Sequence, residues 1–294
     1  MKSQICDLLK IEFPLVAFSH CRDVVAAVSK AGGMGVLGAV GLTPEKLEIE
    51  LNWIDEHVDG KPYGVDVLVP NSYVGKGENL TTDDLRAMIP QEHRDFRSDI
   101  LEQYDLQASD LRSSENSKEL ESNSNGVLGA GLDGAKEVLE VAFAHPISLV
   151  ANALGVPPKW MLEMGKEHNV PVAALVGAKQ HAVKQAEAGV DIIVVSGTEG
   201  GGHCGSVSTM VLVPEVRRAL KDYGDVPILA AGGICTGEQM AGVMAMGADG
   251  VWCASVFLPT TEAETSDNVK EKMIAASSSP VSYTHLTLPT SDLV

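Results

Sequence analysis

The chain has 294 residues, of which 45% are hydrophobic, and this is enough apolar surface for one large globular domain. Asp and Glu total 40 against 22 Lys and Arg, and a surface with a formal charge of −18 repels nucleic acids. The five cysteines include no CxxC pair, which argues against a disulfide framework and a structural zinc site and favours a reducing compartment. The apolar runs are shorter than the ~18 residues of a membrane helix, and the N-terminus shows no secretory signal, so we expect a cytoplasmic protein without membrane contact.

Short, largely apolar segments recur along the chain and alternate with helical patterns. Uniform hydrophobicity is typical of parallel strands that helices cover. The predicted strands are Pro14–Ser19, Gly35–Val40, Tyr63–Pro70, Ile147–Leu154, Pro171–Gly177, Asp191–Gly197, Val226–Gly233 and Gly250–Phe257. Eight strands that alternate with helices indicate an α/β fold, and we expect a closed (β/α)8 TIM barrel in preference to an open doubly wound sheet.

The segments between the strands carry helical spacing and capping residues. Thr43 and Pro44 predict the start of a helix whose inner face is formed by Leu47, Leu51, Ile54 and Val58. A second apolar stripe is formed by Ala135, Val138, Leu139, Ala142 and Phe143. Thr236 predicts the cap of a later helix that Gly247 ends, with its inner face formed by Met240, Val243 and Met244.

Two segments depart from this regular pattern. Residues 71–125 are polar and read as an insertion after the third strand, either a lid, a partly disordered loop or a solvated segment without function. Residues 280–294 resemble a translated sequencing adapter more than natural protein, or else form a short natural tail. We therefore expect a single barrel domain over residues 1–279 and a non-native tail over 280–294.

A GxGxxG string at Gly33–Gly38 matches the pattern of a dinucleotide-binding loop. That loop must follow a strand and open a helix, whereas this string ends the first helix and opens the second strand. We therefore interpret it as tight packing at a helix-to-strand turn.

Two more segments lie at the ends of the seventh and eighth predicted strands, where barrel enzymes build their sites. Both contain glycine or other small residues. Gly232 and Gly233 would let main-chain N–H groups approach an anion, and the stretch Trp252–Ser255 ends the next strand. The pair predicts a phosphate-bearing ligand, and the alternative is an empty tight turn.

The loop after the sixth strand carries the residues best suited to catalysis. In Ser196-Gly-Thr-Glu-Gly-Gly-Gly-His-Cys-Gly205, five glycines surround His203, whose imidazole is suited to proton transfer near neutral pH. Glu199 could hold the loop or orient a partner. Cys204 lacks the sequence context of a barrel nucleophile, so we interpret it as a bystander thiol.

This loop resembles the glycine- and histidine-containing hallmark of the nitronate monooxygenase family of FMN-dependent barrels. The similarity extends to Ala-Ala-Gly-Gly-Ile234, to Met-Gly-Ala-Asp-Gly250 and to the opening segment Phe13–Gly33. It implies that His203 is the catalytic histidine, that Asp66 stands where the family has Asn near the flavin, and that Ser196 replaces a flavin-contacting Gln. It also implies FMN contacts, mainly from the main chain, at Gly201, Gly202, Gly232, Gly233, Trp252, Cys253, Ala254 and Ser255.

The resemblance implies an oxidoreductase that converts alkyl nitronates and O2 into carbonyl compounds and nitrite with FMN and without a metal, and that could form a homodimer. The short Ser196 side chain and a possible charge on Asp66 are departures that would weaken FMN binding or shift its potential. Two alternatives stay open: a flavin-dependent enoyl-ACP reductase that uses NAD(P)H, and a non-catalytic barrel that binds a phosphate ligand.

Overall fold

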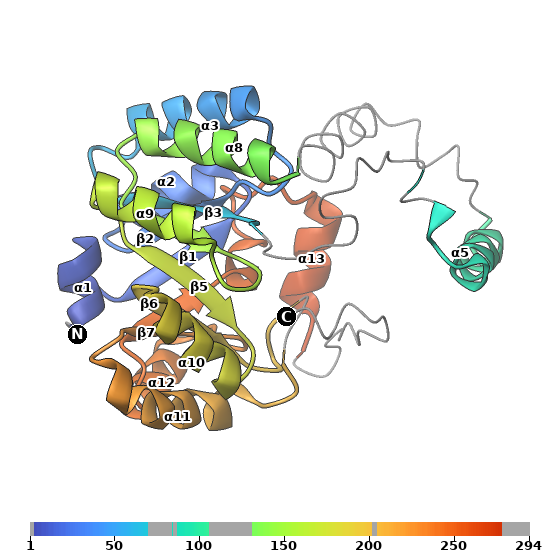
Figure 1. The fold of residues 1–294 in the computed structure, drawn as a ribbon. Coiled ribbons are helices and arrows are strands. Elements are labelled where there is room, and N and C mark those ends of the chain that lie inside the picture. The colour runs from blue at the N-terminus through green and yellow to red at the C-terminus, as the bar shows by residue number, and fades with distance from the viewer. Residues whose placement is uncertain (1–2, 70–83, 85–86, 106–130, 202–204, 278–294) are drawn as a thin grey trace.

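The predicted TIM barrel is present. A computed structural model describes residues 3–69, 84, 87–105, 131–201 and 205–277. Eight parallel strands close into a barrel in chain order, with β8 paired to β1 (Figure 1). The strands are β1 Leu15–Ser19, β2 Met34–Gly38, β3 Tyr63–Val67, β4 Leu149–Asn152, β5 Val172–Val176, β6 Ile192–Ser196, β7 Ile228–Ala231 and β8 Gly250–Cys253. Each lies within its predicted segment, except that β2 begins one residue earlier.

Helices surround the barrel and connect its strands (Figure 1). They are α1 Gln4–Leu9, α2 Arg22–Lys30, α3 Pro44–His57, α5 Gln91–Gln103, α8 Gly131–Ala144, α9 Lys159–His168, α10 Lys179–Ala188, α11 Thr209–Ala219, α12 Gly237–Ala245 and α13 Asp267–Ala275. Short 3-10 turns follow at Leu220–Tyr223 and Ser255–Phe257.

The predicted capping residues begin the helices as expected. Thr43 accepts a hydrogen bond from the Lys46 N–H at 3.4 Å, and Leu47, Leu51, Ile54 and Val58 are all buried. Thr236 and Gln239 form a capping box at the start of α12, where Val243 is buried. In α8, Leu139, Ala142 and Phe143 are buried.

The GxGxxG string begins at Gly33 in the turn after α2 and continues through the whole of β2, so it does not open a helix. A Cβ atom on Gly35 would lie 2.3 Å from the Val25 carbonyl oxygen. Gly35 is therefore required for close packing of α2 on β2, which agrees with the interpretation as tight packing of a helix on the next strand.

Side chains alternate between two buried layers, as strand geometry requires. One cluster fills the barrel interior and includes Val36, Leu149, Val194, Leu229 and Trp252. Two further clusters lie between the strands and the helices. Because Tyr63, Val65 and Val67 of β3 belong to the outer layer, Gly64 and Asp66 face the interior.

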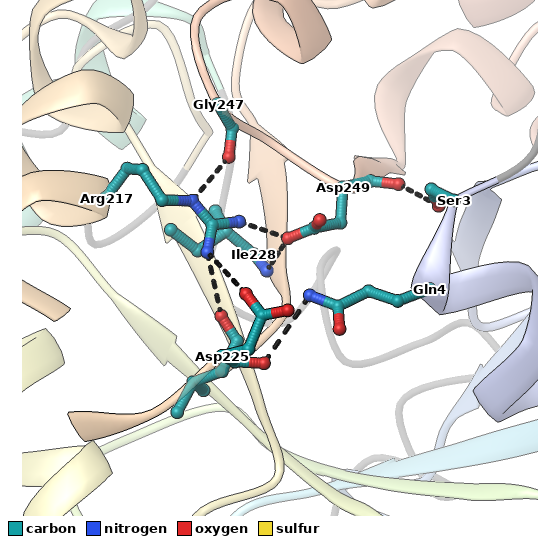
Figure 2. A network of polar contacts seen from close by, with 8 residues as sticks. Ser3, Gln4, Arg217, Asp225, Ile228, Gly247 and Asp249 are labelled. Atoms are coloured by element: carbon teal, nitrogen blue, oxygen red, sulfur yellow. Dashed lines mark hydrogen bonds and ion pairs between the residues drawn. The ribbon is translucent and has the colours of Figure 1, made fainter. Parts of the chain in front are cut away.

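Helix α1 closes the amino-terminal end of the barrel. Its Ile5, Cys6 and Leu9 are buried in the same cluster as the interior strand residues. At its start, the Ser3 hydroxyl donates to the Asp249 carbonyl oxygen, and Gln4 Nε2 lies 3.5 Å from the Asp225 carbonyl oxygen (Figure 2).

Arg217 of α11 anchors the segments on which α1 rests. Figure 2 shows its guanidinium between Gly247, Asp225 and Asp249, with Nε 2.7 Å from the Gly247 carbonyl oxygen. Asp249 pairs with Arg217 and also accepts from the Ile228 N–H at 2.8 Å. The network joins α1 to α11 and to the segments that lead into β7 and β8, and it helps to close the amino-terminal end of the barrel.

The predicted insertion, residues 71–125, contains α5, which buries none of its residues and lies apart from the barrel in Figure 1. The other described residues of this segment are few. The predicted tail, residues 280–294, lies outside the described part of the chain.

Candidate active site at the carboxyl end of the barrel

Three of the predicted cofactor-binding residues are the last or the last but one of their strands, on the inner face of the barrel. Asp66 lies on β3, and Ser196 follows Ile192 and Val194, which face the interior from β6. Trp252 belongs to the interior cluster and is 6% exposed. The strand register pairs Ser196 with Ala231 and Ala231 with Trp252. Ser196 and Trp252 therefore lie on the same side of the mouth.

Asp66 has an unusual environment for a carboxyl group. It is 2% exposed, and its Oδ1 has no hydrogen-bond partner among the described residues. Burial raises the pKa of Asp66 well above its ordinary range, because a charged carboxylate would lose its solvation. The neutral acid offers one donor and one acceptor, the same pair of functions as the Asn side chain expected here.

Aromatic rings line the β1 side of the mouth. Phe18 and Trp252 are stacked with their centroids 6.3 Å apart, and His20 meets Phe18 edge-on at 5.1 Å. His20 Nδ1 lies 3.1 Å from the Gly38 carbonyl oxygen. His20 was not predicted as a site residue, because nothing in the local sequence shows that its ring lies beside Gly38 of the next strand.

Gly232 and Gly233 form the predicted glycine turn after β7. Their φ angles are +93° and +71°, which side-chain-bearing residues rarely adopt. A Cβ atom on Gly232 would lie 2.8 Å from the Gly200 nitrogen, so the turn packs directly on the glycine-rich loop after β6. Within the described part of the chain, the N–H groups of both glycines have no acceptor.

Thr209, the first residue of α11, joins this turn to the glycine-rich loop. Its N–H donates to Glu199 Oε2 at 2.8 Å. Its hydroxyl lies 3.0 Å from the same carboxylate oxygen, 3.0 Å from the Ala231 carbonyl oxygen and 3.1 Å from that of Gly232. Glu199 therefore holds the loop, which is one of the two roles expected of it.

The stretch after β8 can contact a ligand mainly through its main chain. The Cys253 side chain belongs to the outer layer, away from the mouth, and burial raises its pKa to about 11. Ala254 has a short side chain and is half-buried, and Ser255 begins a 3-10 turn on the surface. This agrees with the expected main-chain role of Trp252–Ser255 without testing it.

His203, Gly202 and Cys204 lie outside the described residues. Gly201 is described and exposed, and a Cβ atom there would have no neighbour within 4 Å. The catalytic role of His203 therefore stays a prediction.

The sequence analysis also missed two buried amides that fix a loop at the mouth. Asn152 Oδ1 accepts from the Val69 N–H at 2.9 Å, and its Nδ2 donates to the carbonyl oxygens of Leu154 and Gly155. Gln185 of α10 donates to the same Gly155 oxygen at 3.0 Å. Asn152 ends an apolar run and could have been noticed, whereas Gln185 looks like an ordinary exposed helix residue.

The described residues include no cluster of three or more His, Cys, Asp or Glu that could hold a metal ion. No helix in that part of the chain is both long and apolar enough to cross a membrane.

Two known proteins are similar to this chain in sequence. "Putative monooxygenase Rv1533" of Mycobacterium tuberculosis is 52% identical over 280 residues, which cover 95% of this chain and 72% of that protein. A "Probable nitronate monooxygenase" of Staphylococcus saprophyticus is 25% identical over 285 residues, covering 92% of this chain and 72% of the relative.

Two solved structures share the fold. Nitroalkane oxidase from Streptomyces ansochromogenes superposes with a TM-score of 0.70 at 23% identity, over 92% of this chain and 72% of that one. FabK from Thermotoga maritima superposes with a TM-score of 0.67 at 24% identity, over 94% of this chain and 69% of that one. The family model described as nitronate monooxygenase matches residues 2–289. By this match and by its 52% identical relative, the chain belongs to the nitronate monooxygenase family and is an oxidoreductase.

Proposed function

We propose that this protein is an FMN-dependent nitronate monooxygenase whose active site is the carboxyl end of the barrel. The observation that carries the proposal is the turn at Gly232 and Gly233 after β7, where barrels commonly hold phosphate and where the N–H groups of both glycines have no acceptor among the described residues. Family membership supplies the reaction class.

The residues at the turn suit the phosphate of FMN. Cys235 and Thr236, which follow the turn, donate their N–H groups to Gln239 Oε1 at 2.7 and 3.0 Å. Those amides are already used by the capping box, whereas the N–H groups of Gly232 and Gly233 have no acceptor among the described residues. A side chain at Gly232 would collide with Gly200, which explains why only glycine fits there.

The inner wall of the mouth suits the flavin ring. Phe18 and Trp252 offer an apolar aromatic surface, and Asp66 supplies a buried carboxyl group with one oxygen that has no hydrogen-bond partner among the described residues. Because burial favours the neutral acid, Asp66 can donate a hydrogen bond and need not place a negative charge against the ring. The departure from Asn is therefore compatible with flavin binding.

FMN supplies the electron transfer and the reaction with O2 when it is bound. This chain's residues would bind and orient the nitronate beside it and exclude water. By resemblance, His203 would donate a hydrogen bond to the substrate or hold a proton there. The substrate would be a small alkyl nitronate, with O2 as co-substrate and no metal.

The visible spectrum of the purified protein tests the proposal. We expect oxidised-flavin bands that bleach when a nitronate is added without O2 or NAD(P)H, and nitrite as a product in air. Chromatography of the released flavin should show FMN. A colourless protein that FMN cannot reconstitute would instead support the non-catalytic phosphate-binding barrel.

The alternative function, a flavin-dependent enoyl-ACP reductase, predicts a different outcome of these assays. It predicts NAD(P)H consumption with a crotonyl thioester and no bleaching by nitronate. The cytoplasmic location, the homodimer and the absence of nucleic-acid and membrane partners stay predictions of the sequence.

A further inference from the structure

Helix α5 carries apolar side chains that no other described residue covers. Phe96 and Ile100 of the helix, and Tyr104 directly after it, lie on one side and are 67%, 39% and 66% exposed. The helix lies apart from the barrel (Figure 1). Its 13 residues are few for a helix without tertiary packing, because isolated helices shorter than about 12–15 residues are marginal in water. The apolar side of α5 therefore needs a packing partner.

The opposite side of α5 is polar and makes its hydrogen bonds within the helix. Gln91 Nε2 donates to Asp95 Oδ1 at 2.7 Å, and the Ser98 hydroxyl donates to the Arg94 carbonyl oxygen at 3.0 Å. The helix contains four acidic residues and two arginines, and an anionic membrane surface would repel this charge. A protein partner is therefore favoured over such a membrane.

The charged residues beside the apolar side chains favour a particular protein partner. With Phe96 and Ile100 at the centre of a contact face, Glu92 and Asp99 lie along one flank and Arg97 along the other. In a parallel pair of α5 helices the acidic flank of one copy meets the basic flank of the other, so Glu92 faces Arg97 twice by symmetry. In an antiparallel pair, like flanks would meet. The charges are therefore complementary to a second, parallel copy of the same helix.

We propose that α5 is a dimerisation helix, which packs in parallel against α5 of a second copy of this chain through Phe96 and Ile100. The same surface is used by both copies, so the contact closes as a twofold dimer and does not extend into a fibre. A single pair of short helices buries less area than a standard interface, and the dimer is therefore weak and depends on protein concentration. The inference does not rest on the proposed function, because no residue of α5 belongs to the candidate active site.

Sedimentation velocity of the full chain over a range of concentrations tests for the dimer. We expect a reversible monomer–dimer equilibrium in the wild type and a dissociation constant about 30-fold higher in Phe96→Ser, the loss typical of a central interface residue. The matched control is Ile49→Ser, because Ile49 is an exposed apolar residue of α3 and should not affect the equilibrium. A wild type that stays monomeric at every concentration would overturn the proposal, as would a dimer that Phe96→Ser leaves unchanged.

Charge reversal tests the same contact without removing an apolar side chain. Glu92→Arg and Arg97→Glu should each raise the dissociation constant by about tenfold, because two attractive contacts become repulsive. The double variant restores opposite charges and should associate like the wild type. Glu102→Arg reverses a charge on the far side of the helix and serves as the control. A double variant that associates no better than the single ones would contradict the pairing of Glu92 with Arg97.

Disulfide cross-linking tests the direction of the helices. Gln103 lies on the contact side of α5, where a parallel pair places the two copies of a residue next to each other, whereas Ser98 lies on the opposite side. Under mild oxidation, Gln103→Cys should form a covalent dimer in non-reducing electrophoresis, and Ser98→Cys should form no more than the wild type. Equal cross-linking of the two variants, or none, would overturn the parallel arrangement.

Discussion

At the scale of single residues, Asp66 shows how burial changes the chemistry of a side chain. A carboxyl group in this position is most stable as the neutral acid, so the folded protein holds a proton that the unfolded chain releases at neutral pH. The folded-state pKa is raised, and stability therefore falls as the pH rises above the unfolded value of ~3.9.

We expect Asp66→Asn to stabilise the protein at neutral pH by about 1.4 kcal/mol for each unit by which burial raises the pKa of Asp66, because Asn has no proton to release on unfolding. The gain should widen as the pH rises, because Asn cannot ionise. Urea unfolding of both proteins at several pH values measures it, and FMN affinity should be retained. A gain that is the same at every pH would show that ionisation of Asp66 is not its source.

Thr209 is the other residue with a specific task, because its hydroxyl joins three segments of the mouth. Thr209→Val keeps the shape and the N–H bond to Glu199 but removes the hydroxyl. The turn at Gly232 then loses one of its supports, so we expect weaker binding of FMN while riboflavin, which lacks the phosphate, is affected less.

Fluorescence titration with the two flavins measures this difference, and the loss of stability should be about 1 kcal/mol. Thr209→Ser, which keeps the hydroxyl, serves as the control and should bind FMN like the wild type. If FMN and riboflavin weaken equally, Thr209 supports the fold in general and not the phosphate turn.

At the scale of elements, a polar cluster attaches α3 to the end of α8. His145 Nδ1 lies 2.7 Å from Asp55 Oδ2, and its Nε2 lies 3.2 Å from Glu48 Oε2. Tyr63 of β3 donates to the other oxygen of Asp55 at 2.6 Å. Burial alone would lower the pKa of His145, but the hydrogen bonds to Asp55 and Glu48 outweigh it and raise the pKa above its ordinary value.

The raised pKa predicts a pH-dependent stability. The stabilisation is fully present below the unfolded value of ~6.5 and is lost as the pH rises through the folded-state pKa of His145. We expect the melting temperature to fall over that interval in the wild type and to fall less in His145→Gln. His57→Gln, on the same helix α3, should follow the wild-type curve. An unchanged slope in His145→Gln would contradict the prediction.

The elements differ in how far the sequence could predict them. The strands were recognisable because parallel strands buried on both faces are apolar throughout, and Thr43 and Thr236 are direct capping signals. The turn at Gly232 was recognisable because only glycine tolerates such φ angles. His20 depends on space left by Gly38 on a neighbouring strand, and Gln185 on a carbonyl group of the β4–α9 loop, so neither could be identified from local pattern alone.

At the scale of the whole molecule, the network around Arg217 joins the segments at the amino-terminal end of the barrel. Arg217→Met would leave Asp249 without its cation and the Gly247 carbonyl oxygen without a donor. We expect a loss of about 3 kcal/mol in the free energy of unfolding, the lower range for breaking a largely buried pair.

Urea denaturation measures that loss. The neighbouring Arg218 is exposed, so Arg218→Met is the matched control and should change stability by less than about 0.5 kcal/mol. Similar losses in both variants would show that the network contributes no more than an exposed arginine does.

Helix α1 covers the amino-terminal end of the barrel. Ile5 and Leu9 pack against the side chains that fill the barrel interior, so a substrate bound at the carboxyl end and its product use the same opening. The product must therefore dissociate before the next substrate binds. A product that dissociates slowly should act as a competitive inhibitor of the substrate.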